Sequence, residues 1–187
     1  DLHLGDYRSA IALWRRRPED LEIEGRQGAL LASNLLARGL IADHEVSAGL
    51  RLSRPSDLGG LSGRGLGVAN GDVIRGEVAM QDWPELVAIG EKVFAAMAAD
   101  PRTRQLAFRD AAPALAVGYA HEGRLADAGA LLGRTPLDCT NCLAARGWVA
   151  ELAGDRAAAD GWFAELERAE PDLPGPDAQW GAALLEG

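Results

Sequence analysis

Apolar residues recur at intervals of three and four along most of this chain, and short polar turns separate the segments that carry them. The pattern is clearest in residues 143–171, where two apolar stripes lie on either side of a turn. The first stripe comprises Leu143, Gly147 and Ala150, and the second comprises Ala159, Phe163 and Leu166. This period predicts two short amphipathic α-helices that fold back on one another.

Gly154 and Asp155 mark the turn between these two helices. Glycine readily adopts a positive φ at the C-terminus of a helix, and an aspartate carboxylate can cap the N-terminus of the helix that follows. The small residues Gly147 and Ala159 allow the two backbones to approach closely, with Phe163 filling the space beyond them. We therefore expect a closely packed helical hairpin.

Similar turns recur along the whole sequence. They fall at Gly5, Gly39, Gln81, Gly123, Gly154 and Gly187, with separations of 34, 42, 42, 31 and 33 residues. Apolar stripes at helical spacing lie between them, such as Ala10, Ile11 and Trp14 after the first turn. The two longer intervals predict longer helices in the middle of the chain.

Proline and aspartate residues indicate where several of these helices begin and end. Asp82 and Pro84 predict one helix start, because a proline in the first turn loses no hydrogen bond that a helix would otherwise make. Pro101 ends the same helix. Asp110 and Pro113 predict a second helix start for the same reason.

Residues 57–76 form the least regular stretch, because they contain seven glycines. Each interior glycine costs about 1 kcal/mol of helix propensity relative to alanine, so one interpretation is a partial loop. The interpretation that we favour is a helix that begins between residues 61 and 66 and runs to about Met80. Nucleotide binding is not expected, because Val68 stands where the GxGxxG fingerprint needs its third glycine.

The hairpin of residues 143–171 resembles a tetratricopeptide repeat (TPR), which has a small residue in its first helix, a glycine at the turn, and then alanine, an aromatic residue and proline. The corresponding residues here are Gly147, Gly154, Ala159, Phe163 and Pro171. The resemblance implies an all-α fold, an α-α superhelix in which about four to five antiparallel helix pairs stack into a TPR-like helical-repeat solenoid. We expect residues 1–187 to form a single domain of this kind.

The resemblance also implies a non-catalytic scaffold that binds a protein or peptide partner. In TPR proteins the first helices of the repeats line a concave groove. In this chain Arg26 and Arg75 could pair bidentately with an acidic peptide there. Groove clamps for a C-terminal carboxylate use paired lysine and asparagine residues in this family. Lys92 is the only lysine here, so such a receptor is not expected. Transfer by repeat phase gives the groove candidates Arg26, Ser33, Arg75, Val117, His121, Asn141, Trp148 and Glu151, with Leu36, Val68 and Val78 beside them. An exposed Trp148 would be a binding hot spot, and core packing of its ring is the alternative.

Cys139 and Cys142 form the sharpest chemical motif, a CxxC at the start of a predicted helix. A helix N-terminus favours the thiolate form, but thioredoxin-like chemistry also needs a strand before the motif, and no strand pattern is present. A zinc site needs two further ligands, and none of the three histidines stands at ligand spacing: they are His3, His44 and His121. We expect two structural thiols. A reversible local disulfide, and a thiol-redox or metal-responsive protein, are the alternatives.

Several function classes are not expected. None of the histidines has a nearby nucleophile, so the sequence offers no catalytic set, and we expect no enzyme, no cofactor and no bound metal. The net charge of −9 disfavours a surface that follows nucleic-acid phosphates. No apolar run reaches the roughly 18 residues that span a bilayer, so no membrane span is expected.

The two ends of the chain carry further expectations. The sequence lacks an initiating methionine and opens inside a repeat turn, which predicts a fragment of a larger protein. The Ala- and Gly-rich composition, with arginine in place of lysine, fits a GC-rich genome, and we expect a bacterial signalling or regulatory protein of the cytoplasm. The helix of residues 5–17 lacks a partner, and the last predicted helix carries Trp180, Leu184 and Leu185. Uncovered apolar surface there predicts homodimerisation through one end, unless the last helix folds back over residues 156–170. Self-assembly is therefore a third candidate function.

Overall fold

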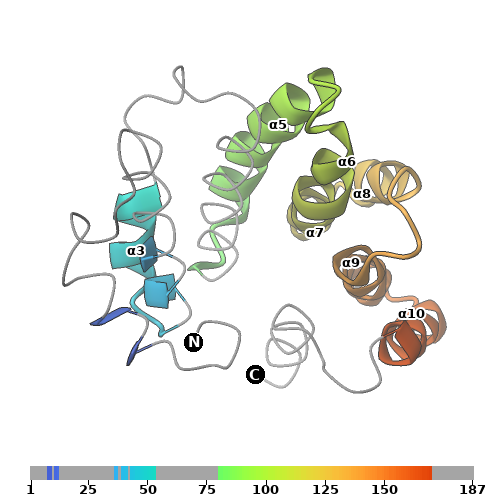
Figure 1. Cartoon of the computed structure of the whole chain (residues 1–187). Coiled ribbons are helices and arrows are strands. Elements are labelled where there is room, and N and C mark those ends of the chain that lie inside the picture. The colour runs from blue at the N-terminus through green and yellow to red at the C-terminus, as the bar shows by residue number, and fades with distance from the viewer. Residues whose placement is uncertain are drawn as a thin grey trace. The chain divides into compact units, whose positions relative to one another are not determined.

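The structure is a computed structural model, and it describes residues 8–9, 11–12, 36–37, 39–41, 43–53 and 80–169. The described residues form helices joined by turns, with no strand among them, so the all-α prediction is confirmed (Figure 1). The helices are α3 (Val46–Ser53), α5 (Trp83–Ala99), α6 (Arg104–Leu106), the π-helical segment η4 (Ala107–Ala111), α7 (Ala112–His121), α8 (Leu125–Leu132), α9 (Thr140–Leu152) and α10 (Arg156–Ala169). The chain divides into two compact units, residues 1–82 and residues 83–187.

In the first unit, the turn before α3 lies at His44 and not at Gly39, where the sequence predicted it. Gly39 is helical, and its carbonyl accepts a hydrogen bond of 2.9 Å from the amide of Asp43. His44 adopts a positive φ of 65°, and the amide of Glu45 donates back to the carbonyl of Leu40 at 2.8 Å. This pattern is a Schellman-type helix end, in which a residue with positive φ closes the last turn. The prediction of a turn at Gly39 was wrong because the helix continues past Gly39 through Leu40 and Ile41, whose side chains are buried in the core.

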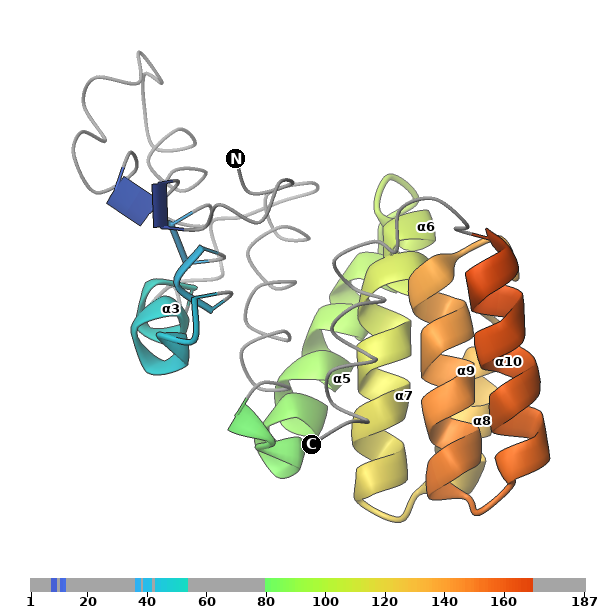
Figure 2. The same cartoon turned by 90° about the horizontal axis from the view of Figure 1, so that it is seen from below.

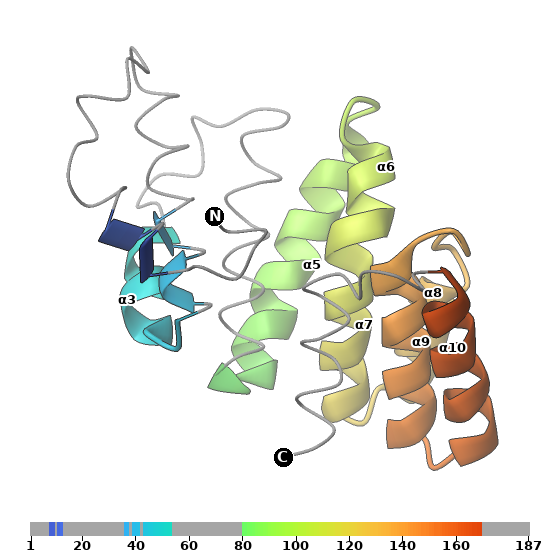
Figure 3. The same cartoon turned by 60° about the horizontal axis from the view of Figure 1, so that its bottom comes forward.

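In the second unit, α5, α7, α9 and α10 lie side by side, and α8 packs on α7 and α9 (Figures 2 and 3). The core contains one leucine from each of three of these helices. Leu86 of α5 has an exposed fraction of 0%, and Leu115 of α7 and Leu143 of α9 each have 1%. Consecutive helices therefore share one continuous apolar core, as expected for stacked hairpins.

The turns of the two complete hairpins have the predicted conformation. Gly123 between α7 and α8 has φ of 75°, and Gly154 between α9 and α10 has φ of 77°. The amide after each glycine donates to a carbonyl five residues earlier: Arg124 to Tyr119 at 2.8 Å and Asp155 to Ala150 at 2.9 Å. The Asp155 carboxylate accepts from the amide of Ala158 at 3.0 Å, which confirms the predicted N-cap.

The first helix of the second unit also follows its predicted bounds. α5 begins at Trp83, places Pro84 in its first turn and ends at Ala99, just before Asp100 and Pro101. Gln81 in the preceding turn has a positive φ of 54°, which is uncommon for a residue other than glycine. The turn position predicted at Gln81 is therefore confirmed.

The helix start predicted at Asp110 was wrong. The helical path begins at Arg104 and continues through η4 into α7, and Asp110 lies inside η4. The amide of Ala112 donates to the carbonyl of Ala107, five residues earlier, which is the bonding pattern of a π turn. Pro113 has no N–H to donate, and the wider turn before it accommodates the proline without ending the helix.

Two of the predicted segments lie outside the described residues. These are the helix expected to begin between residues 61 and 66 and to run to about Met80, of which the structure describes Met80 alone, and the last helix, which carries Trp180, Leu184 and Leu185. Among the described helices, none is both long and apolar enough to cross a bilayer.

Candidate partner-binding face and cysteine site

The first helices of the two complete hairpins are α7 and α9, and they pack against each other. In a solenoid of antiparallel helix pairs, the first helices of successive repeats form one surface. The predicted groove residues of these two hairpins are Val117, His121, Asn141, Trp148 and Glu151. Their exposure decides which of them a partner can touch.

The three candidates on α9 share one face of that helix. Asn141, Trp148 and Glu151 are spaced by seven and then three residues, and side chains at these spacings lie on the same side of a helix. Asn141 and Trp148 are half-buried, and Glu151 is exposed. The indole N–H of Trp148 is buried and has no hydrogen-bond acceptor among the described residues. We name Asn141, Trp148 and Glu151 together the α9 face.

The two candidates on α7 differ from each other. Val117 has an exposed fraction of 4%, so its side chain belongs to the buried core and does not present itself to a partner. His121 is exposed, and its ring stacks on Trp83 of α5 with a centroid distance of 3.7 Å and an interplanar angle of 3°. This stack connects the beginning of α5 to the end of α7.

The stack predicts a shifted titration for His121. Burial lowers the pKa of His121 below its usual 6.5, and the charge of Glu122 opposes that shift. His121 therefore binds its proton more tightly in the unfolded chain than in the folded one. The free energy of unfolding should fall as the pH falls through 6.5 toward the lower folded-state pKa of His121. NMR titration should give a pKa below 6.5 for His121, and Trp83→Ala should return it toward 6.5. A His121 pKa above 6.5 in the parent protein would contradict the prediction.

Of the remaining groove candidates, the structure describes only Leu36. Leu36 is half-buried in the first unit. Those outside the described residues are Arg26, Ser33, Val68, Arg75 and Val78.

A polar network joins α5 to the α7–α8 turn. Glu91 of α5 accepts hydrogen bonds from the hydroxyl of Tyr119 at 3.0 Å and from the guanidinium of Arg124 at 3.1 Å. Arg124 also bonds the carboxylate of Asp127 at 2.8 Å and lies 4.1 Å from the centroid of the Tyr119 ring. Burial, and next the hydrogen bond to Glu91, raise the pKa of Tyr119. Glu91, Arg124 and Asp127 are exposed, and Tyr119 is half-buried. Exposed ion pairs contribute little stability, so we expect the network mainly to fix the positions of these four side chains.

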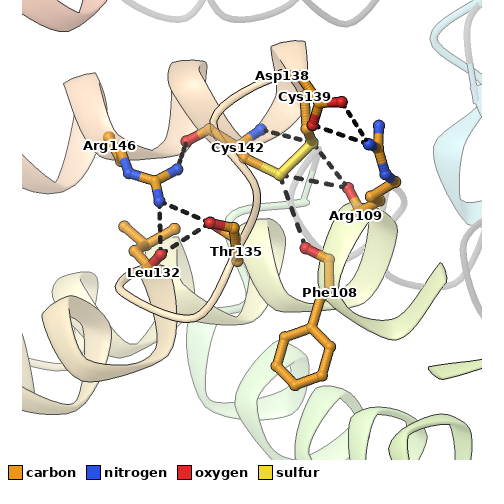
Figure 4. The surroundings of a disulfide bond; sticks show 8 residues. All are labelled: Phe108, Arg109, Leu132, Thr135, Asp138, Cys139, Cys142 and Arg146. Carbon is orange, nitrogen blue, oxygen red and sulfur yellow. Dashed lines mark hydrogen bonds and ion pairs between the residues drawn. A yellow bond between two sulfur atoms is a disulfide. The ribbon is translucent and has the colours of Figure 1, made fainter. Parts of the chain in front are cut away.

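The structure joins Cys139 and Cys142 in a disulfide bond (Figure 4). Cys139 is the N-cap residue of α9, with extended backbone angles, and its sulfur accepts from the amide of Cys142 at 3.2 Å. The exposed fraction is 6% for Cys139 and 0% for Cys142. The pair is therefore a buried part of the contact between α9 and its neighbours.

The loop before the cysteines is tied to η4 by an ion pair. One guanidinium nitrogen of Arg109 lies 2.8 Å and 2.9 Å from the two carboxylate oxygens of Asp138 (Figure 4). Within the part of the chain that the structure describes, no three His, Cys, Asp or Glu residues lie close enough to hold a metal ion.

Sequence reasoning missed an apolar groove between α9 and α10. It has a volume of about 410 Å³ and is lined by Leu137, Leu143, Ala158, Gly161, Trp162 and Glu165. Leu137 has an exposed fraction of 64% and lies at the edge of this groove. The available signal was the spacing of Ala158, Gly161 and Trp162, which puts two small residues beside an aromatic one on the same helix face.

Comparison with known proteins identifies the fold. No protein-family model matches the chain, and no curated protein matches it. The chain is similar to a crystal structure of a point variant of a putative kinesin light chain from Podosopora anserina, described as having nearly identical TPR-like repeats. The TM-score is 0.51 at 17% identity, over 90% of this chain and 96% of the other. A second crystal structure of that protein matches over the same shares with a TM-score of 0.49.

The chain therefore has a TPR-like helical-repeat fold with divergent repeats. At this level of identity the similarity defines the fold alone. Hairpins α7–α8 and α9–α10 are two of its repeats, and α5 precedes them in the chain.

Proposed function

We propose that this protein is a non-catalytic protein-interaction scaffold that binds a protein or peptide along the α9 face. The observation that carries this proposal is the position of Asn141, Trp148 and Glu151 on a first helix of a TPR-like array, with their side chains half-buried or exposed. An amide, a large ring and a carboxylate on one face offer both apolar contact area and hydrogen-bonding groups, as interface residues do.

Binding measurements on surface variants test this proposal. The purified chain would serve as bait, and the proteins that co-purify would then be titrated against it by calorimetry. Trp148→Ala should weaken binding of the recovered partner by about tenfold or more, as expected for an interface hot spot. Glu151→Lys, which leaves the core untouched, should also weaken it. The matched control is Glu167→Lys on the exposed part of α10, which should bind like the parent chain.

Equal binding by the Glu151→Lys, Trp148→Ala and control variants would contradict the proposal that the α9 face is the site. Failure of the parent chain to recover any protein would contradict the scaffold function itself. Identification of the recovered partner would also test the expectation of a signalling or regulatory role.

Homodimerisation through a solenoid end remains a separate prediction. Its residues lie largely outside the described part of the chain, so it rests on the sequence alone. Sedimentation across a concentration series is the test. A species that stays monomeric at about 100 μM, well above the μM affinities of modest interfaces, would contradict it.

A further inference from the structure

Two carbonyl groups beside the disulfide lack the backbone donors that an α-helix would supply. The α-helical donor for the Phe108 carbonyl is the amide of Ala112, which bonds Ala107 instead. In a π-helix the donor for the Phe108 carbonyl would be the amide of residue 113. In an α-helix the same amide would be the donor for the Arg109 carbonyl. Residue 113 is proline and has no N–H. The π turn and Pro113 together therefore remove the α-helical donors of both carbonyls.

The two cysteine sulfurs lie against the same two carbonyls (Figure 4). The sulfur of Cys139 is 3.5 Å from the oxygen of Arg109, and the sulfur of Cys142 is 3.6 Å from the oxygen of Phe108. Cys142 is also 4.0 Å from the Arg109 oxygen. Disulfide sulfurs carry no hydrogen, so in the oxidised form neither can donate. A thiol at either position has an S–H within reach of a carbonyl oxygen whose α-helical donor is missing.

We propose that Cys139 and Cys142 form a reversible thiol–disulfide modification site, whose reduced form donates two S–H hydrogen bonds to the carbonyls of Phe108 and Arg109. The oxidation state then sets how firmly η4 is held against the N-terminus of α9. This proposal is independent of the partner-binding function, and its tests do not use a partner.

The exchange reaction needs an external dithiol reductant such as dithiothreitol. One thiolate of the reductant attacks the sulfur of Cys139, the more exposed of the pair, and breaks the bond to Cys142. Cys142 leaves as a thiolate and takes up a proton. The second reductant thiolate then attacks the reductant sulfur of the mixed disulfide and releases Cys139, which is protonated. The reductant becomes a cyclic disulfide, and two electrons pass to the protein.

Vibrational spectroscopy of the reduced parent protein tests the two hydrogen bonds directly. Both S–H stretching bands should lie at lower frequency in the folded protein than in denaturant, because a hydrogen-bonded S–H vibrates more slowly. Bands at the denatured position would overturn the proposal. This measurement needs no variant and so does not depend on a variant folding.

Hydrogen exchange tests the coupling to η4. On reduction, the amides of residues 107–116 should exchange about 2- to 10-fold more slowly, the equivalent of one net hydrogen bond. Pro113→Ala restores an N–H that can serve the Arg109 carbonyl, so the effect of reduction should shrink or vanish in that variant. The double variant Cys139→Ala with Cys142→Ala should show no response to the reductant. Faster exchange on reduction, or an equal effect in Pro113→Ala, would overturn the proposal.

Discussion

Gly147→Ala should lower the free energy of unfolding by up to about 2 kcal/mol, although alanine is the better helix former. A Cβ on Gly147 would lie 2.5, 2.6 and 2.9 Å from three carbons of the Phe163 ring, distances that require the ring or the helix to move. Overpacking of this kind costs about 1–3 kcal/mol. The gain in helix propensity is only about 1 kcal/mol, so the steric term is the larger of the two. Chemical denaturation of both proteins would measure the difference.

Gly161→Ala is the matched control for this change. Gly161 lies within α10, and a Cβ there meets nothing within 4 Å. Without a clash, only the propensity term remains, so Gly161→Ala should raise the free energy of unfolding by about 0.5–1 kcal/mol. Combining Gly147→Ala with Phe163→Leu should recover part of the loss, because the smaller side chain makes room. A Gly147→Ala protein as stable as the Gly161→Ala protein would contradict the close approach of α9 and α10.

Arg146→Met should lower the free energy of unfolding by about 2–3 kcal/mol, because the side chain loses charge-assisted hydrogen bonds that methionine cannot replace. The guanidinium of Arg146 donates to the carbonyls of Leu132 at 2.7 Å, Thr135 at 3.1 Å and Cys142 at 3.2 Å (Figure 4). It also lies 5.4 Å from the centroid of the Trp162 ring.

The position of these acceptors explains the expected size of the Arg146 effect. Leu132 is the last residue of α8, so the cation sits where the helix dipole is negative. Burial lowers the pKa of Arg146, which reflects the cost of removing the guanidinium from water. Arg146 therefore joins three helices: the end of α8, its own helix α9, and α10 through Trp162.

Arg168→Met provides the control for the Arg146 variant. Arg168 lies on α10, its side chain is 69% exposed, and it pairs with Glu165 at the surface. Exposed pairs of this kind contribute about 0–1 kcal/mol, so this variant should be nearly as stable as the parent chain. Thermal or denaturant unfolding would compare the two. An Arg146→Met protein within about 0.5 kcal/mol of the Arg168→Met protein would contradict the role assigned to Arg146, since surface substitutions usually fall within that range.

The local features of this protein could be predicted from its sequence. The helical period, the positive φ at Gly123 and Gly154, and the N-cap at Asp155 depend on residues within a few positions of each other. The approach of Gly147 to Phe163 could also be predicted, because two amphipathic helices joined by a short turn pack against each other through their apolar faces. These features were sufficient to predict a TPR-like fold.

The candidate site was only partly predictable. Repeat phase identified Trp148 and Glu151 on the α9 face. The same phase placed Val117 in the groove, whereas in the structure the Val117 side chain is buried in the core. A repeat register assigns a side chain to a helix face. It does not show what lies against that face, because the covering residues come from distant parts of the chain.

The tertiary structure alone decided the features that depend on such distant residues. Pro113 can stand in the first turn of a helix or follow a π turn, and both are compatible with the local sequence. The helix continues through η4 because Ala107 and Ala111 are buried there, with exposed fractions of 0% and 2%. Arg146 likewise finds two acceptors far away in sequence. One is 14 residues away on α8, and the other is 11 residues away in the loop after α8. Local period determines where helices form, whereas packing between helices determines which groups lose water and must find partners.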